Sequence, residues 1–316
     1  MGKNRQKAGR NSNSNSRHYT NESWKTVETI KDIENLTGYS ITFDDEGNMN
    51  VQDDEHGTTI IIDKYYLQGA GKRLLNTKNN GAQAKDVGEN TKHPDLATYD
   101  LKDVIRIYNE APDMLKDANG LIVFRKDNIN NNILGEHIAR GQEHAVVINP
   151  ASFGKKDGAF NLSKALYHEM GHGLDYNYNY LHPHEAGLDT FGLSSGNARF
   201  RELVKTPVTE YASFYAGTPD YYKENFAESV GIVATYNNGN HDFVVDTYRN
   251  GRVPVKQWVN ENKELVAETN KVLKGDFNVF DENSNTENGG YYRRWLSNPK
   301  DVKSVREKAE INWDNY

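Results

Sequence analysis

The sequence predicts an α+β fold, and the order of its predicted strands and helices supports this prediction. Two short runs with strand character, 120–125 and 144–149, come before three segments with helical spacing of apolar residues. Strands that precede helices, rather than alternating with them, are typical of α+β domains. The 316 residues are enough to build a hydrophobic core without covalent cross-links. The chain has no cysteine, so any metal must be held by His, Asp or Glu.

The amino-terminal residues 1–23 are basic and polar, and we expect them to form a disordered tail. They lack the apolar segment of a conventional secretory signal peptide. We therefore expect a cytoplasmic protein, or one released by a non-classical route or inside a particle. The chain has no run of about 18 apolar residues, which predicts no membrane association through a spanning helix. Its net charge of −7 gives no reason to expect specific nucleic-acid binding.

Residues 24–95 are expected to form a smaller α/β region followed by a linker. Apolar residues at helical spacing predict a helix over 24–37. Two β-rich runs flank Asp45–Asn48 and predict a hairpin, and a third strand is expected over 58–63. The polar stretch 76–98 is rich in Asn, Gly and Lys, and it predicts a linker and a domain boundary.

Residues 96–275 are expected to form the main domain, and residues 276–316 a short polar appendage. The two predicted strands of this domain are separated by an Asn-rich loop, and residues 176–206 are expected to be irregular. Helices are expected over about 99–110, from about 161–163 onward, over about 220–236 and over about 255–273.

The helix that begins near Ser163 carries the sequence H-E-M-G-H. His168 and His172 are four positions apart and so project from one helix face, about one turn apart. Two imidazoles in this arrangement can bind one Zn²⁺. Glu169 lies beside the first histidine and can reach a water molecule at the metal without binding the metal itself, as in the H-E-x-x-H pattern. The alternative is a helix with two unused histidines.

A catalytic zinc site needs a third protein ligand and one open position. The metzincin extension is absent, because Asp175 and Tyr178 stand where Gly and the third His are required. Further along, the helix at 220–236 carries Glu224 and Glu228, again four positions apart. One of these carboxylates could complete a His₂Glu set, while the other accepts a hydrogen bond from a ligand imidazole. Asp175 could hydrogen-bond a group behind the ligands, or it could lie in a loop.

The segments HEMGHGLD (168–175) and, downstream, SFYA and ENFAE (213–228) resemble the catalytic domain of the anthrax lethal factor family of gluzincin peptidases, which includes the clostridial Pro-Pro endopeptidases. The resemblance covers about residues 118–275. It implies a zincin-like domain with a small sheet, the H-E-x-x-H helix and a following glutamate-bearing helix. It also implies roles for individual residues: Zn²⁺ ligands His168, His172 and Glu224, general base Glu169, and Glu228 as the carboxylate behind a ligand.

The family also uses a tyrosine hydroxyl near the metal, seven residues before the ligand glutamate, to stabilise the oxyanion. That position is Gly217 in this chain, so the pattern departs from the family's. Tyr215 lies nine residues before Glu224 and keeps the S-x-Y-A context with a two-residue insertion. Tyr211 has a similar context but requires an insertion of six residues. We prefer Tyr215 and keep Tyr211 as the alternative.

These features predict a zinc metalloendopeptidase, toxin- or phage-associated, that cleaves a peptide or protein substrate. The family architecture implies that the substrate lies extended along an edge strand, and residues 144–149 are the candidate. One alternative is a non-catalytic zincin-fold structural or regulatory protein, for example a component of a phage or mobile-element particle. The intact Glu169 argues against it. A zinc-dependent repressor protease would require a helix-turn-helix segment, and none is recognisable in residues 1–110.

Overall fold

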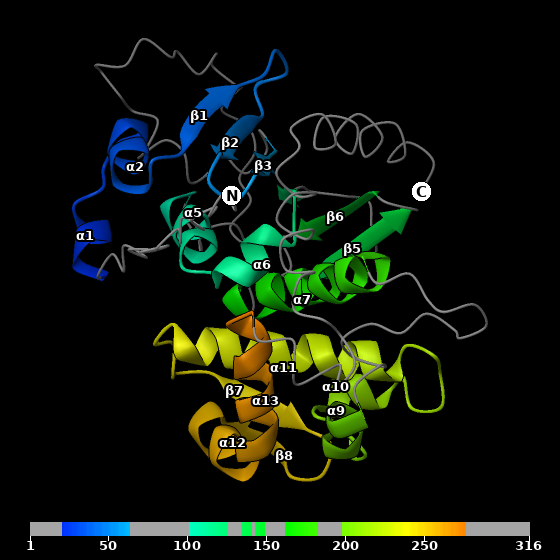
Figure 1. The fold of residues 1–316 in the computed structure, drawn as a ribbon. Coiled ribbons are helices and arrows are strands. Elements are labelled where there is room, and N and C mark those ends of the chain that lie inside the picture. Colours follow the sequence, from blue (N-terminus) through cyan, green and yellow to red (C-terminus); the bar gives the residue numbers. More distant parts are fainter. Residues whose placement is uncertain are drawn as a thin grey trace, which may run out of the picture.

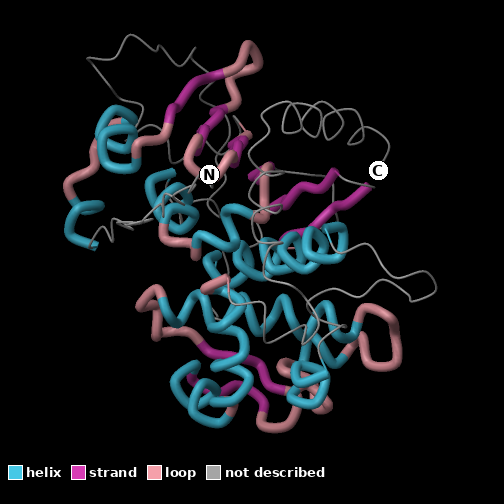
Figure 2. The backbone as a smooth tube through the Cα atoms, viewed as in Figure 1, coloured by secondary structure: helices cyan, strands magenta, loops and turns pink. Residues whose placement is uncertain are grey.

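A computed structural model describes residues 21–63, 101–124, 134–140, 143–148, 162–181 and 198–275. In these residues the chain forms a six-stranded mixed sheet, a separate two-stranded sheet and helices that pack against them (Figures 1 and 2). The predicted α+β class is therefore confirmed for the described part. The predicted tail, the linker at 76–98 and the appendage at 276–316 lie wholly or mostly outside it.

The large sheet has antiparallel pairs at both sides and parallel pairs in its centre. Its order is β1-β2-β3-β4-β6-β5, with β3, β4 and β6 mutually parallel neighbours. The predicted hairpin and the third strand after it are confirmed as β1, β2 and β3. The strand bounds are β1 Ser40–Phe43, β2 Met49–Asp53, β3 Thr58–Ile62, β4 Leu121–Phe124, β5 Gly135–Arg140 and β6 Glu143–Ile148.

Strand β5 corrects two expectations from the sequence. It lies within the stretch that we expected to be an Asn-rich loop, and it pairs antiparallel with β6, from Gly135 opposite Ile148 to Arg140 opposite Glu143. Because β5 takes the outer position, residues 144–149 do not form an edge strand. Strand β6 pairs with β4 along one edge and with β5 along the other, and its residues 144–148 are buried. In the described part of the chain, the edge strand of this side of the sheet is β5.

The strands before and after the predicted linker belong to one sheet. Residues of β3 pair in parallel with β4, for example Ile60 with Ile122. One cluster of buried apolar side chains extends along the chain from Trp24 to Leu273. The amino-terminal strands and the helices around residues 162–237 therefore share a core.

Ten helices are seen in the described ranges. Two predicted helices are each divided in two: the first before Thr29, whose side chain forms a capping box with Asp32, and the last at Asn262. The two central helices, α7 and α11, match their predicted starts. The bounds are α1 Asn21–Lys25, α2 Ile30–Thr37, α5 Leu101–Asn109, α6 Asp113–Asp117, α7 Leu162–Leu181, α9 Ala198–Leu203, α10 Glu210–Ser213, α11 Tyr221–Asn237, α12 Val255–Glu261 and α13 Lys263–Leu273.

Helix α7 lies at the centre of the molecule, between the sheet and α11 (Figure 1). It contacts β5 and β6 on one side and runs alongside α11 on the other. Strands β7 (Val244–Thr247) and β8 (Gly251–Pro254), which the sequence did not predict, form a hairpin on the far side of α11. This arrangement brings the histidine-bearing helix against the glutamate-bearing helix.

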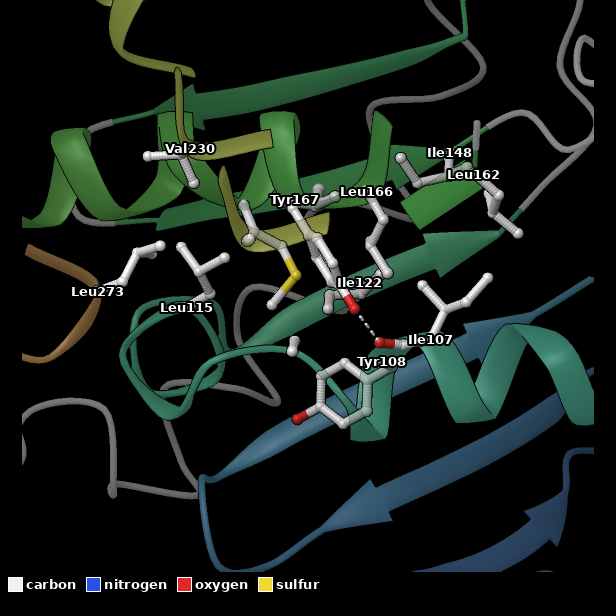
Figure 3. Close-up of a cluster of buried hydrophobic side chains, with 14 of the residues drawn as sticks. Ile107, Tyr108, Leu115, Ile122, Ile148, Leu162, Leu166, Tyr167, Val230 and Leu273 are labelled. Atoms are coloured by element: carbon white, nitrogen blue, oxygen red, sulfur yellow. Dashed lines mark hydrogen bonds between the residues drawn. The ribbon is translucent and has the colours of Figure 1, made fainter. Parts of the chain in front are cut away.

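Buried apolar side chains from α5, α6, α7, α11 and the central strands fix the position of α7 (Figure 3). Tyr167 is fully buried among them, and its hydroxyl donates a hydrogen bond of 2.6 Å to the carbonyl oxygen of Ile107. A buried hydroxyl that lacks a partner is costly, so this bond holds α7 in register with α5. None of the helices in the described segments combines the length and apolar character that crossing a membrane requires.

Candidate metal centre

Three predicted ligand side chains converge where α7 and α11 meet. The Nε2 atoms of His168 and His172 lie 3.2 Å apart. One carboxylate oxygen of Glu224, Oε2, lies 3.5 Å from Nε2 of His168 and 3.4 Å from Nε2 of His172. The three atoms thus form a nearly equilateral triangle. His168 is buried, and Glu224 comes from a helix that begins 40 residues after α7 ends.

This triangle fits a tetrahedral metal ion. Ligand atoms bound tetrahedrally at about 2.0–2.1 Å lie about 3.3–3.4 Å from one another, close to the three observed distances. Among the described residues, Oε2 of Glu224 is enclosed and makes no hydrogen bond, although burial of an unpaired carboxylate oxygen is costly. A cation bound by all three atoms would satisfy that oxygen. The donor set, two imidazoles and a carboxylate, suits a divalent transition metal.

Glu169 is the fourth titratable side chain of the cluster. His168, Glu169 and His172 each offer a ligand atom within 4.8 Å of the other two, so this group could also hold a metal ion. The closer, evenly spaced triangle favours Glu224 over Glu169 as the third ligand. Burial raises the pKa of Glu169, while the two imidazoles act in the opposite direction. A carboxylate with a raised pKa beside a metal site is well suited to accept a proton.

Glu228 lies behind the histidine, away from the triangle. Its Oε1 is 2.9 Å from Nδ1 of His168, and its Oε2 accepts a hydrogen bond of 2.9 Å from Nζ of Lys164. A carboxylate that receives the Nδ1 proton leaves Nε2 free to bind a metal, and it fixes the orientation of the ring. Glu228 thus contacts the ring of His168 from behind, and Lys164 balances its charge.

The electrostatics of the site favour positive charge between the carboxylates. Burial acts to lower the pKa of His168, but the neighbouring carboxylates of Glu224 and Glu228 raise it to about 10. Burial acts to raise the pKa of Glu224, but the two histidines lower it to about 2. The carboxylates thus stabilise a cationic centre, which a bound divalent ion would also provide.

Asn225, which follows Glu224 on α11, positions the segment that leads into α10. Asn225 is fully buried, and its Oδ1 accepts a hydrogen bond of 2.8 Å from the backbone N–H of Val208. The carbonyl oxygen of Val208 accepts from Nε1 of Trp258 at 3.3 Å. Thr209, the next residue, caps α10 by accepting from the backbone N–H of Ala212. These bonds tie the start of α10 to α11 and so determine where Tyr211 lies.

The two candidate tyrosines differ in their contacts with the predicted ligand histidines. The ring of Tyr211 contacts that of His168, with centroids 5.8 Å apart and a near-perpendicular orientation. Tyr215 hydrogen-bonds the hydroxyl of Tyr211 at 3.0 Å, and among the described residues no ring contact joins it to a ligand histidine. Burial, and next the charge of Glu224, raise the pKa of Tyr211. Of the two, Tyr211 is the tyrosine beside the metal ligands.

Asp175 lies one turn beyond His172 on α7 and is buried, 3% exposed. The sequence left open whether this residue belongs to the helix or to a loop, and the structure places it in the helix. Helix α7 continues to Leu181, so part of the stretch predicted to be irregular is helical.

Two histidines near the centre were not singled out from the sequence. His137 on β5 stacks on the ring of His172, with centroids 6.3 Å apart, and its Nε2 lies 3.1 Å from Nδ1 of His144 on β6. The alternation of GEHIAR and EHAVVI would have placed both histidines on one sheet face, had a hairpin been recognised there. Compared with protein-family models, curated proteins and solved structures, the chain gave no match.

Proposed function

We propose that this protein is a zinc-dependent endopeptidase of the lethal factor-like, gluzincin type. The observation that carries the proposal is the triangle of His168, His172 and Glu224, whose edges of 3.2–3.5 Å match a tetrahedral zinc site. A structural zinc site usually has four protein ligands, whereas this triangle supplies three and has Glu169 beside it as a candidate base. This arrangement supports a hydrolytic rather than a purely structural role.

The residues of the site suit hydrolysis of a peptide bond. When bound, zinc would lower the pKa of a water molecule towards about 7 and polarise the scissile carbonyl. Glu169 accepts a proton from the attacking water and later delivers it to the leaving amine. The hydroxyl of Tyr211, like that of any tyrosine with a pKa of 10 or above, is protonated at neutral pH, and it donates a hydrogen bond to the carbonyl oxygen as negative charge develops there.

The substrate is an extended peptide that adds to β5, the outermost strand on this side of the sheet among the described residues. Strand addition uses backbone hydrogen bonds and therefore suits many sequences. The α7-facing side of this strand carries Gly135, which lies against Glu169, and His137, which stacks on His172. A peptide on this edge would pass the metal centre.

A comparison of the parent protein with Glu169→Gln tests the proposal. We expect both proteins to bind about one Zn²⁺ per chain, and the variant to cleave peptides at least a hundredfold more slowly. Zinc is measured by elemental analysis, and cleavage by mass spectrometry of a mixed peptide library, with and without chelator. Glu202→Gln, an exchange of an exposed residue of α9, is the matched control. Equal cleavage by Glu169→Gln would exclude the mechanism. A parent that binds zinc but cleaves nothing would favour the non-catalytic alternative.

A further inference from the structure

A series of hydrogen bonds leads from the interior of the protein to the edge strand. Nδ2 of Asn177, on α7, donates a hydrogen bond of 2.5 Å to the carbonyl oxygen of Ala118 and lies 2.8 Å from Nε2 of His144. Nδ1 of His144 lies 3.1 Å from Nε2 of His137. Asn177 and His144 are buried, at 1% and 6% exposed. His137 is only partly buried.

The amide of Asn177 sets the direction of the first two bonds. Its NH₂ group can donate to both the carbonyl oxygen of Ala118 and Nε2 of His144. If the amide were turned round, its oxygen would face the oxygen of Ala118, and two acceptors would meet without a proton. Nε2 of His144 is therefore an acceptor, and the proton of this imidazole is on Nδ1.

The same reasoning extends to the second histidine. The Nδ1–H of His144 points to Nε2 of His137, so that Nε2 must accept and the proton of His137 must also be on its Nδ1. Protonation of either ring would put two N–H groups face to face. Both rings are thus neutral and locked in one tautomer. Burial, which lowers the pKa of His144 to about 4, acts in the same direction.

The donor at the end of the series is available to a ligand. No acceptor for Nδ1 of His137 is found in the described part of the chain, and this atom is not one of the fully enclosed polar atoms. His137 lies on edge strand β5, in ring contact with His172 and with Tyr176. An N–H group fixed in direction next to a metal ligand is pre-organised to bind an acceptor at little entropic cost.

We propose that His137 is a substrate-binding residue whose Nδ1–H donates a hydrogen bond to a carbonyl oxygen of the bound peptide, and that Asn177 and His144 fix the tautomer that makes this possible. This inference rests on the proposed peptidase function and adds a contact on the edge-strand side of the metal centre. It also gives a reason for the polar series within an otherwise apolar interior.

The tautomers can be measured without any substrate. In ¹⁵N-histidine-labelled protein, nitrogen shifts distinguish the ring nitrogen that carries the proton from the one that does not. We expect His137 and His144 both to carry it on Nδ1, with peaks assigned by their loss in single variants. A proton on Nε2 of His137 would overturn the inference, whatever the enzymatic activity.

Two substitutions separate the role of the donor from that of the ring. The side-chain amide of Asn falls near Nδ1 of a histidine, and that of Gln falls near Nε2. We expect His137→Gln, which keeps a partner for His144 but loses the Nδ1 donor, to raise KM about three- to tenfold with kcat little changed. His137→Asn should retain most of the parent's KM. His241→Gln, at a histidine bonded to the backbone of Tyr236, is the matched control.

The substrate for this test is the best-cleaved sequence from the mixed peptide library. If the parent cleaves no peptide, the proposed function itself fails. If the parent cleaves and His137→Gln has the KM of the parent, only the present inference fails. Equal losses in His137→Gln and His137→Asn would assign His137 a role in packing against His172 rather than in binding a carbonyl, and would likewise overturn the inference.

Discussion

The side chain of Glu169 lies directly against the backbone of Gly135. A Cβ atom placed on Gly135 would lie 2.8 Å from Cγ of Glu169, 3.1 Å from its Oε1 and 2.9 Å from Cδ1 of Ile148. Distances this short require the side chain of Glu169 or that of Ile148 to move. The glycine of the edge strand thus sets how closely the proposed general base approaches the sheet.

Replacing Gly135 with Ala should therefore displace the carboxylate of Glu169. We expect kcat to fall about tenfold to a hundredfold, because small errors in the position of a catalytic group are costly. Zinc content should be unchanged, since none of the three ligand atoms belongs to β5. The measurement is steady-state kinetics with elemental analysis, and Ile138→Val, on the opposite face of the same strand, is the control. A parental kcat in Gly135→Ala would show that Glu169 does not depend on this contact.

The contact between α7 and α11 depends on a second glycine. A Cβ on Gly231 would lie 2.7 Å from the carbonyl oxygen of Lys164 and 3.2 Å from Cβ of His168. In an exposed helix, Gly→Ala stabilises by up to about 1 kcal/mol. Here we expect the opposite, a loss of about 1–3 kcal/mol in the free energy of unfolding, because the helices must separate.

Separation of the two helices also moves Glu224 away from the histidines. Gly231→Ala should therefore bind zinc more weakly as well as unfold more easily. Urea denaturation of the metal-free protein and competition with a zinc indicator measure the two effects. Increased stability together with unchanged zinc affinity would contradict the packing described for this interface.

The two tyrosines should differ in their contribution to catalysis. Tyr211→Phe removes the hydroxyl of the tyrosine whose ring contacts His168, and we expect kcat to fall about a hundredfold, as for the loss of an oxyanion donor. Tyr215→Phe removes only the hydrogen-bond partner of Tyr211, so its effect should be tenfold or less. The measurement is kcat of the two variants and of the parent under the same conditions. A larger loss in Tyr215→Phe would restore the preference based on sequence spacing.

The buried His144 should make the protein less stable in mild acid. Its pKa is lowered from 6.5 to about 4 by burial, so between these values the unfolded chain binds a proton that the folded protein does not. Stability is therefore unaffected by this group above about pH 6.5 and falls as the pH drops towards 4, by at most about 3 kcal/mol. Urea denaturation of the metal-free protein across this range should show a steeper pH dependence for the parent than for His144→Gln. The same pH dependence of stability in the parent and in His144→Gln would contradict the lowered pKa of His144.

The helices of the site, and the face of each helix on which the candidate ligands lie, were largely predictable because they depend on local spacing. His168 and His172 share a helix face by their four-residue separation alone, and so do Glu224 and Glu228. That these two helices pack together is not a local property. It depends on Gly231 and on a core that draws side chains from most of the chain.

The edge of the sheet was mispredicted for the same kind of reason. Strand β5 carries Gly135, His137 and Arg140, and it lacks the β-branched run that marks a strand in a sequence. Its pairing with β6 outweighs this weak propensity. One other signal was present but unused: the capping-box spacing of Thr29 and Asp32, which predicts a helix start at residue 30.

The parallel pairing of β3 with β4 also bears on how this protein can be divided. Strand β4 is fully buried, and one of its two ladders of backbone hydrogen bonds is completed by β3. A fragment beginning near residue 96 would keep all three ligands, yet it would leave β4 with a row of unpaired N–H and C=O groups on an apolar strand. Such strands recruit other chains. A fragment that lacks residues 21–63 should therefore aggregate, because β3 no longer pairs with the exposed side of β4.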